Sequence, residues 1–193
     1  MVGPSGRKIG QPERKKGKKM WEMDYDRAAE YWTEKDRNSP SMPEDKLREK
    51  IEAFIRENNT CALAAASSDM VRCTPIEYIY IDGAFYMFSE GGLKFRCLKE
   101  NSNVGLAVYR SYEGFGKLKS LQVTGRASVL EPFSEEYLKA MEIRKIPVEQ
   151  MKKLPHPMNL IKVVPEALDY LDSGLKKEGF EVRQHLEMKS DQA

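Results

Sequence analysis

Hydrophobic residues recur along this chain with two periods, one typical of helices and one typical of strands. The helical period covers 25–36 and 43–58, and shorter helical patterns follow at 95–100 and 134–154. Pro147 breaks the last of these. Short apolar runs between turn residues predict strands at 60–66, 71–81, 84–89, 104–109, 118–130, 159–170 and 180–186.

These elements indicate the fold class. Six or seven strands with helices at both ends, and little alternation of strand and helix, favour an antiparallel α+β barrel over a parallel sheet. Gly125 interrupts the long strand at 118–130, where a bulge or bend is expected. We find no internal repeat, and we expect a single domain over 24–193 after a disordered tail over 1–23.

One segment combines a hairpin signal with groups that bind phosphate. Asp82-Gly83 between alternating apolar runs predicts a tight turn. The first strand opens with Arg72, and the second ends at Ser89 before a Gly-Gly pair and Lys94. An Arg fork, hydroxyls and a Lys at a helix start could surround a phosphate with charge-assisted donors. The alternative is an ordinary hairpin with solvated charges at its ends.

The order of these motifs resembles the FMN-binding split barrel of the pyridoxamine 5'-phosphate oxidase-like superfamily. The resemblance covers 47–131. Its elements are Arg-x-Thr-Pro at 72–75, the step from Ser89 to Lys94, Asn-x-x-Val at 101–104, and Gly-Arg-Ala at 125–127. It implies a six- to seven-stranded split β-barrel with flanking helices, and a homodimer with two FMN molecules in the subunit interface.

The resemblance also assigns roles to residues of this chain. It implies that Arg72, Ser89 and Lys94 hold the flavin phosphate, while backbone near Thr74 and Pro75 lies along the isoalloxazine ring. Gln122 could donate to the flavin from the partner subunit, or it could simply point outward from a half-exposed strand. The residues predicted to bind the cofactor are Arg72, Cys73, Thr74, Pro75, Ser89, Lys94 and Gln122.

Two departures weaken the resemblance to the vitamin B6 oxidases themselves. Those enzymes have the pattern Arg-x-x-x-x-Lys on the first strand, and its Lys holds the substrate phosphate. In this chain the residue at the position of that Lys is Glu77. A carboxylate repels a phosphate. Their typical Trp-containing C-terminal motif is also absent, and Arg183-Gln184-His185 matches their Arg-x-His element only over three residues. The FMN site is therefore better supported than vitamin B6 chemistry.

Composition limits the other function classes. Apolar residues make up 40% and charged residues 32% of the 193 residues, and no apolar run is long enough to span a membrane. The basic start has no apolar run after it, so it is not a secretory signal, and we expect a cytoplasmic protein. Residues 1–20 carry a net charge of +6, which leaves −4 for the rest. Such an arm could bind nucleic acid, but a solvated tail is more common.

Metal chemistry and classical acid-base sites are not indicated. Cys61, Cys73 and Cys97 do not cluster, and the chain has only two histidines, so we expect no metal site. His156, between two prolines, is the weak candidate for an acid or base. We therefore expect the flavin to carry the reaction.

Three functions remain open on this basis. The first is an FMN-dependent oxidoreductase acting on a small organic substrate, with reduced nicotinamide as a possible electron donor. The second is a flavin or haem carrier or sensor of the same fold without turnover. The third is a vitamin B6 oxidase, against which Glu77 counts.

Overall fold

The computed structural model describes residues 24–188, except for the side chains of residues 36 and 37. The predicted basic tail over 1–23 lies outside the described residues. The chain divides after Arg37 into two compact units. The described part of the first unit is a helix, α1 (Tyr25–Arg37), as the 25–36 pattern predicts. Asp24 begins it by accepting a hydrogen bond from the backbone N–H of Arg27.

The described part of the second unit, residues 38–188, contains eight strands and four α-helices, besides two short 3₁₀ turns. Their positions agree with the sequence pattern to within a few residues. They are α2 (Glu44–Glu57), β1 (Thr60–Ala66), β2 (Val71–Glu77), β3 (Ile79–Ile81), β4 (Ala84–Ser89), α3 (Lys94–Glu100), β5 (Asn103–Tyr109), β6 (Lys119–Leu130), α4 (Glu135–Ile143), α5 (Val148–Lys152), β7 (Asn159–Asp172) and β8 (Arg183–Glu187).

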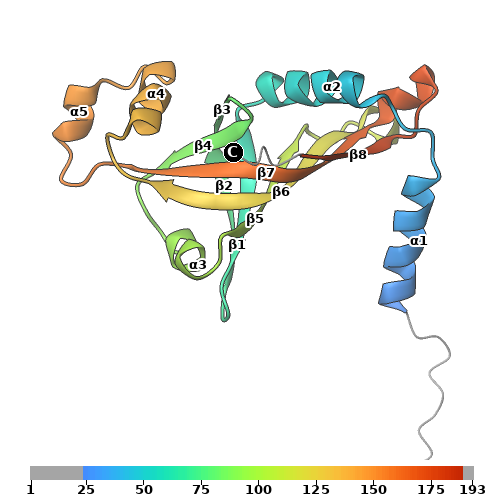
Figure 1. The fold of residues 1–193 in the computed structure, drawn as a ribbon, viewed down its shortest axis with the longest axis horizontal. Helices are drawn as coiled ribbons and strands as arrows, with labels where there is room; N and C mark the ends of the chain where they lie inside the picture. Colours follow the sequence, from blue (N-terminus) through green and yellow to red (C-terminus); the bar gives the residue numbers. More distant parts are fainter. Residues whose placement is uncertain (1–23, 189–193) are drawn as a thin grey trace, which may run out of the picture. The chain divides into compact units, whose positions relative to one another are not determined.

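The strands form one antiparallel sheet that curls back on itself (Figure 1). Its order is β2-β1-β5-β6-β7-β4-β3, with β8 added to β7. The first and last strands of this path, β2 and β3, are consecutive in the chain and are separated only by Tyr78. Because the path ends where it begins, the sheet is a split barrel. The predicted α+β split-barrel fold is confirmed.

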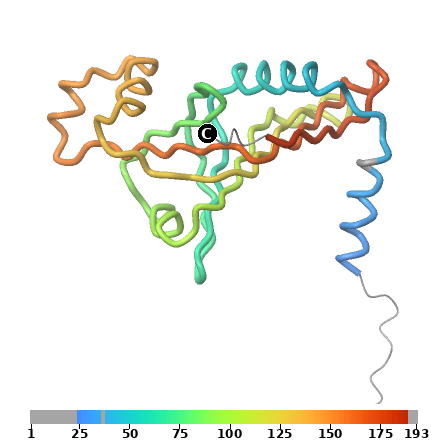
Figure 2. The backbone as a smooth tube through the Cα atoms, in the orientation of Figure 1, coloured from blue at the N-terminus to red at the C-terminus, as the bar shows by residue number. Residues whose placement is uncertain are grey.

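Tyr78 is the residue at which the barrel turns. Its side chain is buried, its backbone N–H donates to the carbonyl of Asn59, and its hydroxyl donates to the carbonyl of Ile55 at 2.7 Å. These two bonds hold Tyr78 against Asn59 and Ile55, at the point where the chain passes from β2 to β3. The prediction of one continuous hairpin over 71–89 is therefore wrong in its first strand. Only β3 pairs with β4, while β2 pairs with β1, and the turn of that pair projects beyond the other strands (Figure 2).

The hairpin turn and the bulge are where the sequence predicts them. Asp82 and Gly83 join β3 to β4 with φ of 47° and 81°, the left-handed pair that a two-residue hairpin needs. The register of β6 against β7 shifts between Thr124 and Gly125. At this shift the two backbones approach closely, since a Cβ on Gly125 would lie 2.5 Å from the carbonyl oxygen of Val164.

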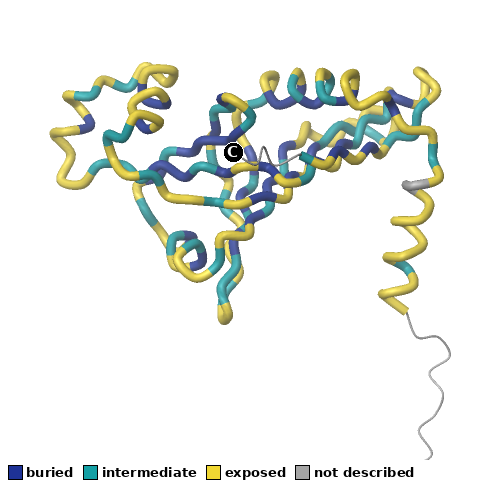
Figure 3. Tube along the Cα trace, in the orientation of Figure 1, coloured by how far each residue is buried: buried dark blue, intermediate teal, exposed yellow. Residues whose placement is uncertain are grey.

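Two apolar clusters hold the second unit together. The larger fills the barrel and is closed by the predicted stripe of α2, whose inner face is buried (Figure 3). The smaller lies under α4 and α5, which cover the β3–β4 end of the sheet (Figure 1). Tyr137 of α4 is its largest fully buried member, and its hydroxyl donates to the carbonyl of Met158.

Gln184 ties β8 to the segment before α2. Its side chain is buried, with the amide oxygen accepting from the N–H of Met42 at 2.8 Å. The amide nitrogen donates to the carbonyls of Glu181 and Pro40 at 2.8 and 3.3 Å. One side chain therefore satisfies three backbone groups.

Gln184→Leu should lower the free energy of unfolding by about 1–3 kcal/mol, because an apolar side chain leaves buried backbone groups without partners. Urea unfolding followed by circular dichroism measures this. Gln150→Leu, on the exposed face of α5, is the matched control and should change stability by less than about 0.5 kcal/mol. Equal effects of the two changes would contradict the assignment.

His185 of β8 is held by carboxylates on both ring nitrogens. Asp169 Oδ1 lies 2.7 Å from Nδ1, and Glu187 Oε1 lies 2.9 Å from Nε2. These bonds raise the pKa of His185 above its ordinary value of 6.5. Only the imidazolium can donate to both carboxylates at once.

The two bonds of His185 to Asp169 and Glu187, which we call the histidine clamp, predict a stability that depends on pH. Because the folded state raises the pKa of His185, its contribution is complete below about pH 6.5 and is lost as pH rises through the folded pKa. His185 is half exposed, so the expected contribution is about 0.2–1 kcal/mol. Thermal unfolding should separate wild type from His185→Gln at pH 6 and less at pH 9. A difference that does not vary with pH would contradict the clamp.

Candidate functional site

The side chain of Lys94 is buried at the start of α3. It is 7% exposed, and its ammonium donates to the carbonyl of Gly91 at 2.6 Å and lies 5.2 Å from the centre of the Phe95 ring. No carboxylate among residues 24–188 pairs with it. An ammonium has three N–H donors, so two remain for a ligand. A buried cation in this state is costly unless an anion binds it.

Arg72 of β2 brings a second positive charge to the same place. Burial lowers the pKa of Lys94, and the nearby Arg72 guanidinium lowers it further. Two cations without an acid between them repel each other. An anion placed between them would remove that repulsion and would meet the planar fork of an arginine, which binds phosphate oxygens in pairs.

The loop from β4 to α3 places backbone around this position. Ser89 ends β4 with its hydroxyl directed to the carbonyl of Gly91 at 3.3 Å, so within the chain it caps its own loop. Gly92 has φ of 108°, which L side chains rarely adopt, and a Cβ there would lie 3.6 Å from the Lys94 ammonium. Glycine is thus required at position 92 by its backbone conformation, whereas Gly91 has room for a side chain.

Asn159 holds this loop from the other side, and sequence reasoning missed it. It lies opposite Ser89 in the β4–β7 ladder, and its amide donates to the carbonyls of Ser89 and Glu90 at 3.3 Å each. The two residues are far apart in sequence. No local pattern marks such a contact.

The remaining predicted residues of β2 divide between its two faces. Thr74 shares the core-facing side with Arg72, whereas Cys73 and Pro75 lie on the outer side and are exposed. Within residues 24–188, β2 forms its ladder with β1 alone. Its other edge offers free backbone groups, and Pro75 is tolerated there because an edge strand does not need every N–H.

The structure thus gathers Arg72, Ser89 and Lys94, but it does not bring Gln122 to them. Gln122 is exposed on β6, and β5 and β1 lie between it and Pro75. At about 4.8 Å per strand this separation is about 14 Å. His156 is exposed in the loop between α5 and β7.

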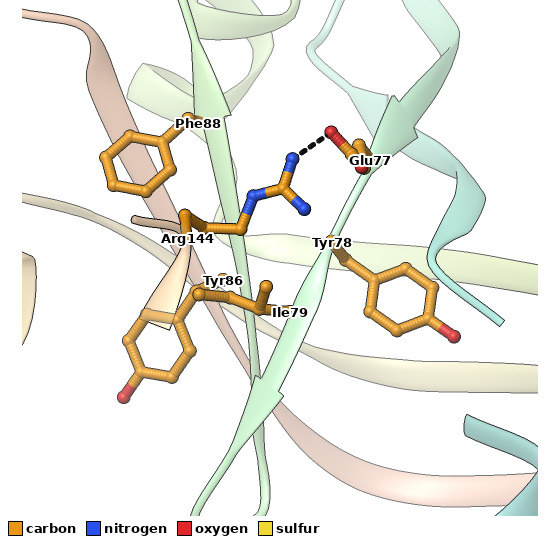
Figure 4. A pocket seen from close by; sticks show the side chains of 6 residues that line it. All are labelled: Glu77, Tyr78, Ile79, Tyr86, Phe88 and Arg144. Atoms are coloured by element: carbon orange, nitrogen blue, oxygen red, sulfur yellow. Dashed lines mark hydrogen bonds and ion pairs between the residues drawn. The ribbon is translucent and has the colours of Figure 1, made fainter. Parts of the chain in front are cut away.

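An ion pair lies at the end of β2, at the position where the vitamin B6 oxidases have a lysine. Glu77 is bound by Arg144, which follows α4. Figure 4 shows the guanidinium between Phe88 and Glu77. These residues border a pocket of about 30 Å³, enough for one water molecule, with Tyr86 in its wall. No local pattern marks Arg144, which is 67 residues from Glu77 in the chain.

The outer face of the sheet beside Pro75 carries only small side chains. Ala62 and Ala64 of β1 lie next to Ala107 and Gly105 of β5. All four are half-buried. We call these four residues the small-residue floor. Cys73 and Pro75 border it on one side, and Gln122 and Thr124 on the other.

A family model described as pyridoxamine 5'-phosphate oxidase matches residues 47–172, which is more than half of the chain. The chain belongs to the pyridoxamine 5'-phosphate oxidase-like family. The family match begins in α2 and ends with β7, so it contains the whole β2 to α3 site. A search of curated protein sequences found no match.

Solved structures share the fold of this family member at low sequence identity. A FAD-binding protein from Mesorhizobium loti is 22% identical, with a TM-score of 0.51 over 63% of this chain and 89% of that one. HutZ, a heme storage protein from Vibrio cholerae, is 19% identical, with a TM-score of 0.52 over 61% and 89%. ChuZ from Campylobacter jejuni is 17% identical, with a TM-score of 0.59 over 76% and 61%. At these identities they establish the fold alone.

Among residues 24–188, no group of three or more His, Cys, Asp or Glu side chains could hold a metal ion. In the same part of the chain, none of the helices has both the length and the apolar character needed to cross a bilayer. All three cysteines are free thiols.

Proposed function

We propose that this protein is an FMN-binding oxidoreductase that acts as a homodimer on a small organic substrate, with reduced nicotinamide as electron donor. The observation that carries the proposal is the buried Lys94 beside Arg72, two cations that no described carboxylate neutralises. The flavin phosphate is the anion that the family resemblance assigns to this place. The free thiols support a reducing, cytoplasmic setting.

The residues present fit such a cofactor. Arg72 and Lys94 supply charge-assisted donors, and Ser89 supplies a hydroxyl that can turn from Gly91 to the phosphate. The free edge of β2 near Thr74 and Pro75 offers backbone groups to the ring. When bound, FMN would supply hydride or electron transfer, while the protein orients it and excludes water.

The direct test is reconstitution. Purified protein incubated with FMN and freed of excess should be yellow and should release FMN on denaturation. Reduced nicotinamide should then bleach the flavin faster than it bleaches free FMN. Protein that stays colourless would overturn the proposal and the site together.

The small-residue floor supports the homodimer. A flat face of Ala and Gly lets a second sheet approach closely, and packed sheets lie about 10 Å apart. Since Gln122 lies about 14 Å from Pro75 in one chain, it can serve a flavin on β2 only from the partner. An obligate interface of this kind buries more than roughly 2,000 Å² in total.

Ala107→Glu should therefore give a monomer and lose FMN binding, because it places a charge in the middle of the floor. Sedimentation at micromolar concentration measures the first effect and flavin fluorescence the second. Ala53→Glu, on the exposed face of α2, is the matched control and should remain dimeric. A stable monomer that binds FMN one to one would show that one chain completes the site.

The second candidate is a flavin or haem carrier without turnover. It is favoured by the similarity to a heme storage protein and by the exposed, unengaged position of His156. Against haem, the other histidine, His185, has both ring nitrogens bound to carboxylates, so one bond must break before it can ligate iron. Tight cofactor binding with no acceleration of nicotinamide oxidation would favour this candidate.

Vitamin B6 oxidation is the weakest of the three. Glu77, paired with Arg144, occupies the position where the true vitamin B6 oxidases have a phosphate-binding lysine. The carboxylate of Glu77 neutralises the positive charge of Arg144, so this position offers no net positive charge to a substrate phosphate. Pyridoxamine 5'-phosphate should accordingly not reduce the bound flavin.

A further inference from the structure

The helix α1 presents nearly all of its described side chains to solvent (Figure 3). From Tyr25 to Lys35, every residue is exposed except Ala28, which is half-buried. A helix of 13 residues is marginal in water, because most helical stability in proteins comes from packing of an apolar face. None of these α1 residues is buried, so the described chain does not supply that packing.

The side chains of α1 are divided by type between two faces. One face carries small and aromatic residues at the spacing i, i+3, i+4 and i+7: Tyr25, Ala28, Ala29 and Trp32. We call these four residues the aromatic face. The opposite face carries carboxylates: Asp26, Glu30 and Glu34. The helix is therefore amphipathic, and its apolar side is exposed.

The large side chains on and beside the aromatic face are of the kind found at lipid headgroups. Tyr25, Tyr31 and Trp32 are 78%, 60% and 49% exposed. Tyrosine and tryptophan combine an apolar ring with a polar tip, and they are enriched where acyl chains meet headgroups. The ammonium of Lys35 lies 4.8 Å from the centre of the Trp32 ring. From there a lysine can extend its charge into a polar layer while its stem stays on apolar surface.

The chain before α1 adds positive charge. Residues 1–20 carry a net charge of +6, which leaves −4 for the rest of the chain. Four of these basic residues stand close together: Lys15, Lys16, Lys18 and Lys19. Each basic residue near an anionic membrane strengthens binding by roughly fivefold. The rest of the chain is repelled by such a surface, so the attraction belongs to the N-terminal segment.

A nucleic acid would also attract this positive segment, but α1 does not suit it. Nucleic acid repels the carboxylates of α1 and has no use for a stripe of alanines. A membrane interface accommodates both faces, because the apolar face enters it while the charged face stays in water. The two-sided pattern of α1 therefore favours a lipid surface.

We propose that α1 and the basic segment before it form a membrane-binding element that docks on bilayers containing anionic lipids. The helix lies in the plane of the interface, with the aromatic face at the boundary of headgroups and acyl chains and Glu30 and Glu34 in water. Stable association of this kind takes two signals, here an apolar face and a polybasic segment. The inference does not depend on the FMN site, since Arg72 and Lys94 take no part in it.

The segment after α1 joins this element to the barrel. The carbonyl of Pro40 accepts from the N–H of Glu181 at 3.0 Å, and the N–H of Met42 donates to Gln184 at 2.8 Å. The chain is thus attached to the β8 region three residues after α1 ends at Arg37. A lipid-bound α1 would hold the barrel close to the bilayer, where apolar substrates concentrate.

Sedimentation with sucrose-loaded vesicles tests the docking on the full-length protein. It should bind vesicles of phosphatidylcholine with about 30% phosphatidylserine at least tenfold more tightly than phosphatidylcholine alone. About 0.5 M salt should remove most of this difference, because it screens exposed charges. Replacing Lys15, Lys16, Lys18 and Lys19 together by Gln should weaken binding to the anionic vesicles by roughly 100-fold.

Trp32→Ala tests the aromatic face and should weaken binding by roughly tenfold or more, since the apolar surface that enters the interface is lost. Alanine is the best helix former, so the change does not act by breaking α1. Glu30→Ala, on the opposite face of the same helix, is the matched control and should bind at least as tightly as wild type. FMN affinity should be unchanged in both variants.

Fluorescence shows whether Trp32 enters the lipid. The chain has two tryptophans, so Trp21→Phe leaves Trp32 as the only one. With anionic vesicles its emission should shift to shorter wavelength, and brominated acyl chains should quench it. These changes are expected for a ring buried about 5–10 Å into the interface.

Four outcomes would overturn the proposal. The first is no binding to anionic vesicles. The second is Trp32→Ala binding as wild type does, because the basic segment alone would then explain the association. The third is a Trp32 emission that vesicles do not change. The fourth is tight binding of a single-stranded oligonucleotide that anionic vesicles do not displace, which would assign the basic segment to nucleic acid.

Discussion

Lys94→Met should weaken FMN binding by roughly 10- to 150-fold, and Arg72→Met should do the same. Each change removes a charge-assisted bond to the phosphate, worth about 1.5–3 kcal/mol, at about 1.4 kcal/mol per tenfold. Methionine keeps most of the apolar stem of the buried Lys94, so packing is preserved. Fluorescence quenching of FMN on titration with protein gives the affinities.

The control ligand is riboflavin, which lacks the phosphate, and its affinity should hardly change. Lys99→Met, at an exposed position of the same helix, is the matched variant and should bind FMN as wild type does. Equal losses for riboflavin and FMN would mean that these cations support the fold and do not contact the phosphate.

The same substitution should not destabilise the protein without cofactor. Since burial and Arg72 lower the pKa of Lys94, folding disfavours its charged form. Lys94→Met removes that cost, so the cofactor-free variant should unfold at the same or a higher temperature than wild type. Lower affinity together with undiminished stability is the pattern expected of a binding residue.

Gly125→Ala should produce the largest loss of stability among single methyl additions to the barrel. The new Cβ would lie 2.5 Å from the carbonyl oxygen of Val164 and 3.2 Å from Pro165 Cα, both backbone atoms of β7. Neither can move without disturbing the longest ladder of the sheet. Overpacking of this kind costs about 1–3 kcal/mol, and sometimes more.

For a chain of this length, each kcal/mol lowers the melting temperature by about 2–4 °C, so a decrease of roughly 2–12 °C is expected by calorimetry. Gly116→Ala is the matched control, because a Cβ there meets nothing within 4 Å. A Gly125→Ala protein that melts as wild type does would show that the bulge can open at no cost.

The sequence predicts the elements well because their signals are local. Apolar periods locate α2 and the strands, and Asp82-Gly83 marks a turn because two left-handed residues in succession suit few other pairs. Gly125 marks the bulge, since a long strand rarely contains glycine without such a reason. Each of these predictions depends on a few consecutive residues.

Which strands pair with each other could not be predicted from a few consecutive residues. The alternation from 71 to 81 fits a strand of either ladder, and the bend at Tyr78 depends on acceptors in α2 and before β1. The prediction of one long hairpin was wrong for this reason. Arg72 and Lys94 nevertheless lie close together. The expected reason was a shared hairpin, whereas the observed reason is that α3, which begins with Lys94, packs against β1 and β2.

Taken by itself, the sequence determined the order of helices and strands, the barrel class and the group of cations in the β2 to α3 segment, because periodicity and motif spacing act over short stretches of chain. Only the tertiary structure decided which polar and charged groups contact each other and which, such as Lys94, have no carboxylate partner among the described residues. Glu77 binds Arg144, and Asn159 donates to the carbonyl of Ser89, between elements that are distant in sequence. Such contacts depend on register and packing, which no local pattern specifies.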